Sequence, residues 1–414
     1  MPLNATGLQV PLPISSGILN LHGWKVTALA ETKNSYTVEA EYDAPTICPQ
    51  CGGTEYVRFG VREQEYHDLP VHMKKVAIQV KRQRYKCKAC GYVYVPPIPY
   101  MHDDHQMTDR LVEFICKQSV RAPTFAALGR LIGLHETTIK NVFTEYLIEL
   151  DRNYVIETPE WLGIDEVKLG GQMRVVFTNV RERKPIALLP VYEIEVVREF
   201  MLKKLDRAAI KGVVIDMSPM FRSAVEELLP DAIVIVDKFH IVKKANECLD
   251  KVRKDIRKRD DMPHAQSKQL KKNRRWLMMN EKNLNDGQKF KLSVWLLNFD
   301  SFGKAYAAKE AYKAIWNSDT REIAEYLYNE RYKKLDPEIN PFFLELMRAT
   351  KNWWAYIFNY FEYRFTNAYT EAANGMMKEI QKAGRGYSFD VIRAKLVYGL
   401  APETENEVIP PDWW

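Results

Sequence analysis

Long apolar runs and a secretory leader are both missing from this sequence. No stretch of about 18 or more apolar residues occurs, and the first residues lack a basic head followed by an apolar core. The chain has six cysteines, of which four fall into two CxxC pairs, so the disulfide framework of a small secreted protein is excluded as well. We therefore expect a soluble intracellular protein that has no transmembrane helix.

An excess of acidic charge is also lacking. The 414 residues carry a net charge of +6, and a hydrophobic share of 46% is enough for two or three domains with cores. Lysine and arginine are dense in residues 251–258 and 268–275. Each block alone is more typical of a solvated face. Together with the acidic site described below, the two blocks indicate contact with a polyanion.

The two CxxC pairs predict a zinc site. Each pair is followed by a glycine, and the paired residues are Cys48 with Cys51 and Cys87 with Cys90. Four thiolates satisfy a tetrahedral Zn²⁺ and leave no open position, so we expect one structural zinc ion in a β-rich module. Four unrelated thiols are the alternative, and the spacing disfavours it.

A helical pattern follows over residues 108–118, 124–131 and 135–150, with Gly133 at a turn. The last two segments predict a helix-turn-helix whose recognition helix covers residues 135–146. On this helix Ile139, Val142 and Phe143 would pack inward. The residues expected to face the DNA major groove are Thr137, Thr138, Lys140 and Asn141. An ordinary helical hairpin remains the alternative, but the neighbouring zinc and basic modules favour DNA binding.

Short apolar runs that end on an aspartate form the centre of the chain. Residues 212–215 stop at Asp216 and residues 232–236 stop at Asp237, with a helical segment between them. Such runs predict buried parallel strands, and ligands of open α/β sheets bind beyond the carboxyl ends of their strands. The simpler interpretation is that Asp216 only begins a turn or caps the helix.

A third strand of this kind, residues 161–168, contains Asp165 near its end. Strand-like segments at 174–180 and 185–191 and a helix at 194–205 complete the order βββαβαβ, which predicts an α/β ribonuclease-H-like domain. In that fold the first and fourth strands are neighbours, so Asp165 and Asp216 would meet. Two close carboxylates repel each other unless a cation lies between them, so this pair predicts a divalent metal site. Glu166 should point to the opposite face of its strand, and we do not expect it to be a ligand.

The third ligand should come from a helix near the C-terminus, after a long all-helical insertion. A helical pattern within residues 365–387 places four polar side chains on one face: Glu371, Asn374, Lys378 and Lys382. An acid beside an amide and two lysines suits a site that holds metal and phosphate together. A solvated helix face is the alternative.

These motifs, in this order, resemble the ISL-three family of bacterial insertion-sequence transposases, a group of DDE enzymes. The resemblance runs from Cys48 to about Tyr398 and includes the stretches LGIDE, VVIDMSPMFRSAVEELLP, VDKFHIVK and TNAYTEAANGMMKEIQKAGRGY. The zinc knuckles of the family fall on the four cysteines. Its catalytic triad falls on Asp165, Asp216 and Glu371, and its aspartate-phenylalanine-histidine element falls on Asp237, Phe239 and His240.

The resemblance implies a transposase that binds the terminal inverted repeats of its element and catalyses DNA cleavage and strand transfer. Two Mg²⁺ (or Mn²⁺) ions would lie at the triad, and His240 would touch the scissile phosphate or the leaving group, or else only pack. DNA contacts are expected from Lys378, Lys382 and Arg385. The implied partners are double-stranded DNA, both element ends and target, and further copies of the chain in a homodimer or higher oligomer. The implied location is the bacterial cytoplasm, at the nucleoid.

The expected organisation has four parts. Residues 1–99 would form the zinc-binding module and residues 100–155 the helix-turn-helix domain. The catalytic domain would comprise residues 156–245 and 362–400, interrupted by the helical insertion of residues 246–361. Two other functions remain open, a metal-dependent nuclease of the same fold and a domesticated DNA-binding regulator whose catalytic domain is inactive.

Overall fold

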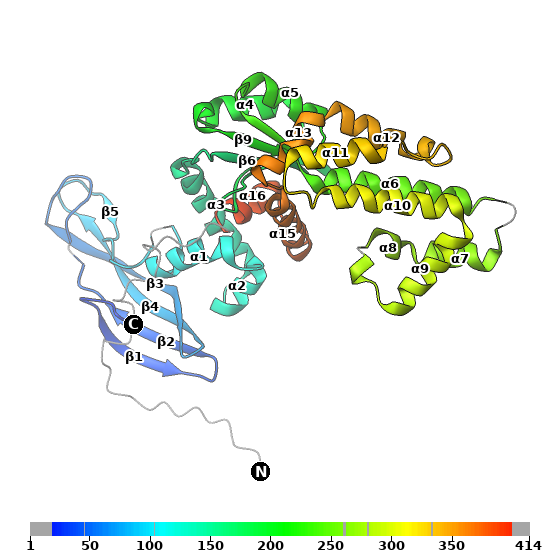
Figure 1. Ribbon diagram of the computed structural model, residues 1–414. Coiled ribbons are helices and arrows are strands. Elements are labelled where there is room, and N and C mark those ends of the chain that lie inside the picture. The colour runs from blue at the N-terminus through cyan, green and yellow to red at the C-terminus, as the bar shows by residue number, and fades with distance from the viewer. Residues whose placement is uncertain are drawn as a thin grey trace, which may run out of the picture. The chain divides into compact units, whose positions relative to one another are not determined.

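The computed structural model describes residues 19–399, except for residues 45, 103, 260, 261, 280 and 333 and the side chain of Lys282. The described residues form two compact units, drawn in Figure 1. The first comprises residues up to 154 together with 382–387, and the second comprises residues 155–381 together with those from 388 onward. None of the described helices is long and apolar enough to cross a membrane.

The first unit begins with a mostly antiparallel sheet. Its strand order is β1-β2-β4-β3, and the short β5 also pairs with β4. The strands are β1 (Lys25–Glu31), β2 (Ser35–Glu41), β3 (Tyr56–Val71), β4 (Lys74–Cys87) and β5 (Val93–Tyr94). Alternate residues of β2 and β4, such as Val38, Ile78 and Val80, are buried with Trp24 and Tyr66 in a small core. This alternation is the period expected of strands with one buried face.

Three helices follow the sheet in the first unit: α1 (Asp109–Arg121), α2 (Phe125–Ile132) and α3 (Glu136–Asn153). The side chain of Thr124 caps α2 by accepting a hydrogen bond from the N–H of Ala127, and Gly133 ends α2 in a left-handed conformation with φ of 81°. A glycine adopts this conformation at little cost, which explains the tight turn between α2 and α3.

The second unit is built on a five-stranded sheet with the order β10-β9-β6-β7-β8. The strands are β6 (Trp161–Leu169), β7 (Gln172–Asn179), β8 (Lys184–Leu189), β9 (Gly212–Ile215) and β10 (Ile233–Val236). Strands β6, β7 and β8 form an antiparallel meander, whereas β9 is parallel to both β6 and β10. The carboxyl ends of β6, β9 and β10 therefore lie at one edge of the sheet.

Helices cover both faces of this sheet. In Figure 1, α4 (Ile194–Lys204) and α5 (Pro219–Leu228) lie on one side, and α15 (Ala368–Gly384) and α16 (Phe389–Val397) lie on the other. The Ser218 side chain caps α5, and Pro219 takes the first helical position, where its missing N–H costs nothing.

Between β10 and α15 the described residues form α-helices, one short 3-10 helix (Glu281–Asn283) and connecting turns, with no strand among them. The α-helices are α6 (Lys238–Ile256), α7 (His264–Lys272), α8 (Arg274–Met278), α9 (Asp286–Asn298), α10 (Asp300–Ile315), α11 (Arg321–Tyr332), α12 (Asn340–Asn352), α13 (Trp354–Phe358) and α14 (Tyr360–Tyr363). Helices α6 and α10 run side by side (Figure 1). One continuous cluster of buried apolar side chains joins the sheet to these helices, with the rings of Tyr312, Tyr328 and Tyr332 packed together in it. The insertion therefore shares the core of the sheet.

Candidate active site and zinc site

The parallel pairing of β6 and β9 brings two aspartates together. Gly163 lies opposite Val214 in the register, so Asp165 and Asp216 both come just after the paired part of the strands. Both side chains are buried, with relative exposures of 4% and 8%. Ligand atoms of Asp165, Glu166 and Asp216 all lie within 4.8 Å of one another.

The position of Glu166 differs from the sequence prediction. We expected its side chain on the far face of β6, but it joins the cluster of Asp165 and Asp216. Strand β9 pairs with β6 only over residues 161–163. Beyond that point β6 has an open edge toward Asp216, and the longer glutamate side chain can reach around it.

The electrostatics of this first cluster favour a bound cation. The pKa of Asp165 is raised to about 7, mainly by burial. A hydrogen bond from the N–H of Glu166 opposes this rise, and the charges of Asp216, Glu166 and Glu371 add to it. Burial likewise raises the pKa of Asp216 to about 7, with the charge of Glu166 as the next cause. Oxygen donors that repel one another and are removed from water fit a hard divalent ion such as Mg²⁺ or Mn²⁺.

Glu371 lies in a second cluster of potential ligands. Its carboxylate and the side chains of Asp237 and His240 have ligand atoms within 4.8 Å of one another, and His240 Nε2 is 3.7 Å from Glu371 Oε1. Among the described residues, Asp165, Asp216 and Glu371 do not together form a group of this closeness. Burial lowers the pKa of His240 and raises that of Glu371, so the surroundings favour the neutral form of each group more than water does.

Helix α15 is held on β6 by polar side chains spaced at helical intervals. Asn367, just before the helix, donates through Nδ2 to the carbonyl oxygen of Ile164 at 3.2 Å. Thr370 Oγ1 lies 2.6 Å from Thr178 Oγ1 on β7, and Asn374 Nδ2 donates to Asp165 Oδ2 at 2.9 Å. These contacts place Glu371 near the carboxyl ends of the strands, and they also orient Asp165.

Gly163 allows this close approach. A Cβ atom at that position would lie 2.7 Å from both Asn367 Oδ1 and Thr370 Oγ1, and closer still to Thr178 Oγ1. Real Cβ atoms do not come so near other atoms, so α15 could not pack on β6 in this way with any other residue at position 163.

We expect Gly163→Ala to destabilise the fold by about 1–3 kcal/mol, the usual cost of overpacking a buried site. The DNA cleavage that the family resemblance implies should fall by about 10²-fold, because misplacing a catalytic group by about 1 Å has that effect. Thermal unfolding and a cleavage assay measure the two quantities. Gly375→Ala is the matched control, since that glycine is exposed on α15 with no atom near its added Cβ. It should stabilise the helix slightly and leave cleavage unchanged. Equal effects of the two substitutions would contradict this account.

The predicted recognition helix corresponds to α3, which begins at Glu136 with His135 as its N-cap. Ile139, Val142 and Phe143 are buried. The other face carries the residues expected to meet DNA, of which Thr138 is half-buried and three are exposed: Thr137, Lys140 and Asn141. The cations predicted near the C-terminus, Lys378, Lys382 and Arg385, are also exposed and form no ion pair with any described acid.

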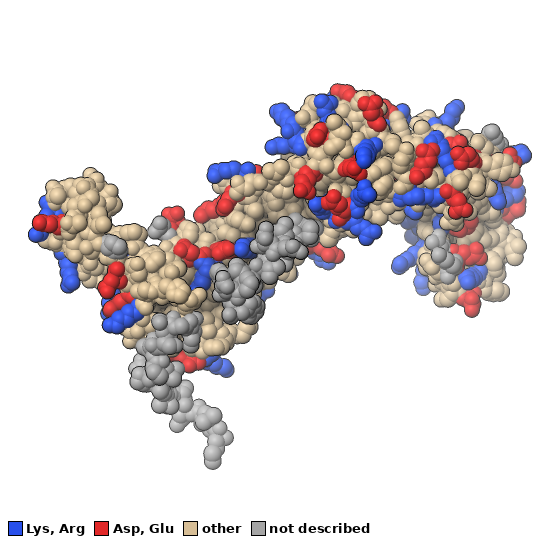
Figure 2. Space-filling model, turned by 60° about the vertical axis from the view of Figure 1, so that its left-hand side comes forward, with Lys and Arg blue, Asp and Glu red and all other residues tan. Residues whose placement is uncertain are grey.

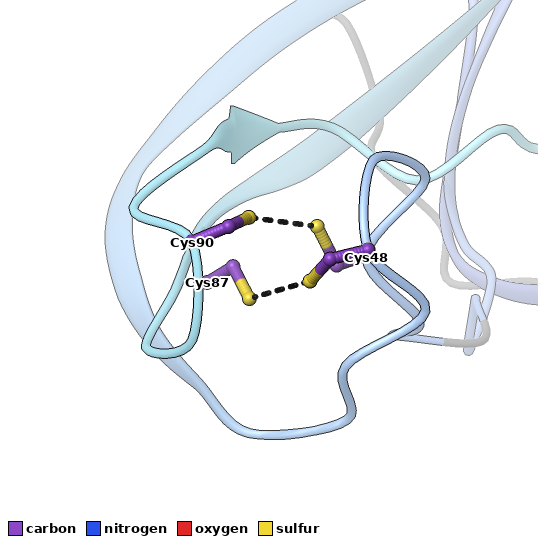
Figure 3. A group of neighbouring side chains, drawn as sticks. Cys48, Cys87 and Cys90 are labelled. Atoms are coloured by element: carbon purple, nitrogen blue, oxygen red, sulfur yellow. Dashed lines mark hydrogen bonds between the residues drawn. The ribbon is translucent and has the colours of Figure 1, made fainter.

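The four CxxC cysteines come together in the first unit. Figure 3 labels three of them, Cys48, Cys87 and Cys90. Cys48 Sγ is 3.6 Å from Cys90 Sγ, and Cys51 Sγ is 3.6 Å from Cys87 Sγ. Sulfur atoms bound tetrahedrally to one Zn²⁺ at about 2.3 Å are about 3.8 Å apart, so the spacing fits a zinc ribbon. The backbone N–H of Cys90 donates toward Cys87 and lowers its pKa to about 7, which favours the thiolate that zinc requires.

Comparison with known proteins agrees with both sites. The family model of the DDE transposases of the ISL3 family, described as a transposase, matches residues 162–396. A second model, the zinc-finger of transposase IS204/IS1001/IS1096/IS1165, matches residues 44–90. The chain belongs to the ISL3 (ISL-three) family of DDE transposases, as the sequence motifs predicted.

A curated relative is the transposase for insertion sequence element IS1001 of Bordetella parapertussis. It is 25% identical over 349 residues, which cover 82% of this chain and 85% of the relative. Family membership makes the chain a DNA-transposing enzyme with a mixed α/β fold, an N-terminal zinc ribbon and a helical region.

Sequence reasoning missed several residues of the site. Glu166 was not expected near the acidic cluster, and Asp237 received no role beyond its place in a family motif. Gly163 and Thr370 gave no recognisable signal, because their importance arises only from the contact between α15 and β6. The helical spacing of Asn374 and Glu371 was the one available hint of that contact.

Proposed function

We propose that the chain binds the terminal inverted repeats of its insertion sequence, cleaves DNA strands there and joins the ends to target DNA. The observation that carries this proposal is the presence of two acidic clusters in the second unit, Asp165 with Glu166 and Asp216, and Glu371 with Asp237 and His240. The strand order β10-β9-β6-β7-β8, with a parallel β6–β9 pair, supports a ribonuclease-H-like catalytic domain. The family match supports DNA as the substrate.

The residues of the two acidic clusters would hold the divalent cations. Bound Mg²⁺ or Mn²⁺ would supply Lewis-acid activation of water or a DNA 3′-hydroxyl and charge stabilisation of the leaving oxygen. Asn374 orients the Asp165 carboxylate through its Nδ2–H. The exposed Lys378 lies two turns after Glu371 on α15, where an ammonium group can contact a DNA phosphate.

The basic blocks of the sequence differ in their surroundings. In the first block, Arg253 is buried against Asp250, and Lys251 pairs with Glu345. In the second, Lys268, Lys271 and Lys272 are exposed on α7 and pair with no described acid. On the face drawn in Figure 2, cations and acids are interspersed and do not form one basic field. We propose that α7 is a site of DNA backbone contact.

Replacing two of these lysines should weaken binding equally for all DNA sequences. Each phosphate contact adds about 0.9 to the slope of log K against log salt concentration. Lys268→Gln/Lys272→Gln should therefore reduce this slope by about 2, measured by fluorescence anisotropy over a salt series. The matched control is Lys203→Gln/Lys211→Gln, which removes the same charge from lysines already paired with Glu199 and Glu160. A slope unchanged in the first variant would exclude contact through α7.

A strand-transfer assay tests the proposed function. The DNA flanking the coding region supplies the candidate inverted repeats, and oligonucleotides with pre-cleaved ends are incubated with the protein, Mg²⁺ and a target plasmid. We expect joined products that depend on the repeat sequence. Cleavage without joining would instead identify a nuclease, and binding without either reaction would identify a DNA-binding regulator.

A further inference from the structure

We propose that the side chain of Phe239 inserts between DNA bases next to the scissile phosphate and holds one of them out of the duplex stack. This inference deepens the proposed function and rests on it, because it requires that the acids of the second unit receive a DNA strand. The ligand of the ring is a single base of double-stranded DNA, and stacking on an aromatic ring suits all four bases.

The ring of Phe239 is exposed, although its neighbours in the first turn of α6 are packed. Phe239 is 54% exposed and does not belong to the apolar core that joins the sheet to the insertion. Ile241 is fully buried in that core. Lys238 Nζ donates a hydrogen bond to the hydroxyl of Tyr360 at 2.9 Å and lies over its ring. The backbone is therefore fixed on both sides of Phe239, and the ring projects into solvent from a firm support.

The position of this ring matters more than its exposure. Single exposed apolar side chains are ordinary on protein surfaces, but Phe239 lies beside the candidate active site. Its ring centroid is 5.7 Å from that of His240, with the two planes at 80°, and His240 Nε2 is 3.7 Å from Glu371 Oε1. Successive nucleotides of one strand are about 3.4 Å apart along a duplex. A phosphate held at these side chains would therefore bring a neighbouring base within reach of the ring.

The recessed position of the acids gives the inserted ring a function. Asp165 and Asp216 are only 4% and 8% exposed, so a phosphate has to leave the smooth path of a duplex backbone to reach them. Proteins produce such distortions by inserting apolar side chains, phenylalanine among them, between base steps. Unstacking the bases costs free energy, and stacking of the displaced base on the aromatic ring offsets that cost.

A cation lies on the same face of α6 as Phe239. Lys243 follows it by one helical turn and is exposed. Burial lowers the pKa of His240 and raises that of Glu371, and the charge of Lys243 lowers both, so its ammonium group lies near these two side chains. An ammonium group there suits the phosphate backbone that flanks the displaced base. An aromatic ring beside a cation matches a nucleotide better than it matches an apolar protein surface.

Cleavage of repeat DNA by the full-length, zinc-loaded protein with Mg²⁺ tests the proposal. Phe239→Ala should cleave fully paired DNA about 5- to 150-fold more slowly, the range that corresponds to the loss of one base–aromatic stack. A mismatch at the base beside the cut should restore most of the rate, because that base is already unpaired. Phe239→Trp should keep the wild-type rate. Phe290→Ala is the control, since that ring is 71% exposed on α9, and it should change neither rate.

Unstacking is measured separately from cleavage with 2-aminopurine placed beside the cut, whose fluorescence rises when the base leaves the stack. The Asp216→Asn protein should bind this DNA without cutting it and raise the fluorescence. Asp216→Asn/Phe239→Ala should bind it without the rise. The melting temperature of Phe239→Ala should equal that of the wild type, because the ring is exposed.

A fluorescence rise that persists without the ring would overturn the proposal. So would cleavage of paired DNA by Phe239→Ala at the wild-type rate, or an equal loss on paired and mismatched DNA. A changed oligomeric state of Phe239→Ala with unchanged fluorescence would identify the ring as a protein contact instead. Failure of the proposed function is distinguishable, since the wild type would then cleave and join no DNA, whatever the fluorescence showed about Phe239.

Discussion

Asp216→Asn is expected to reduce DNA strand cleavage by at least about 10³-fold and to leave DNA binding intact. Loss of a direct metal ligand removes several kcal/mol of transition-state stabilisation, and about 4 kcal/mol corresponds to this factor. The substitution keeps the size of the side chain, and its amide oxygen can still accept the hydrogen bond that the N–H of Ser218 donates to Asp216 Oδ1 at 3.0 Å. Cleavage of labelled repeat DNA and anisotropy measure the two quantities.

The same variant should be more stable than the wild type when divalent ions are removed by a chelator. The folded state raises the pKa of Asp216 from 3.8 to about 7, so folding binds protons and the wild type loses stability as pH rises through this window. A neutral asparagine side chain has no charge to bury. The melting temperature of Asp216→Asn at pH 8 should therefore exceed that of the wild type. Asp231→Asn, at an exposed position after α5, is the control and should change neither cleavage nor melting. Cleavage by Asp216→Asn at the wild-type rate would exclude Asp216 from the catalytic site.

The strands of the second unit could be predicted well from the sequence. Residues 212–215 were predicted as a strand and form β9 with the same bounds, because an entirely apolar, β-branched run between Lys211 and Asp216 has no other place than the inside of a sheet. Helix ends were less accurate. The helix predicted for residues 135–150 extends to Asn153, since no glycine or proline marks its end until Pro159.

The grouping of the acids could not be predicted in the same way. It depends on which strands stop first and on how close α15 comes to β6. Glu166 comes close to Asp216 beyond the point where β9 stops pairing with β6, and neither segment alone shows where that pairing stops. The place of Glu371 depends on Gly163, whose missing side chain matters only after the helix has packed. Sequence patterns describe single elements, whereas these contacts belong to pairs of elements far apart in the chain.

Replacing one cysteine of the zinc ribbon should greatly weaken its binding of Zn²⁺. Zn²⁺ binding contributes about 10–16 kcal/mol to the folding of small zinc modules, so one of four ligands corresponds to about 2.5–4 kcal/mol. Cys87→Ser should therefore weaken Zn²⁺ binding by about 10²- to 10³-fold, measured by competition with a chromogenic chelator. Cys116→Ser, at a half-buried position on α1 outside the ribbon, is the control and should bind Zn²⁺ as tightly as the wild type.

The structural consequence should be confined to the ribbon. Among the residues that the structure describes there, its apolar cluster consists of Cys48, Cys87 and Tyr94 with Tyr85 against it, too little buried surface to hold the two knuckles without the ion. The sheet below has a separate core around Trp24, Tyr66 and Ile78. Hydrogen exchange in Cys87→Ser should therefore become fast in residues 46–56 and 87–95 and stay slow in the middle of β2 and β4. Loss of protection throughout the sheet would mean that the zinc ion organises the whole module, and full protection of the knuckles would mean that the cysteines hold no structural metal.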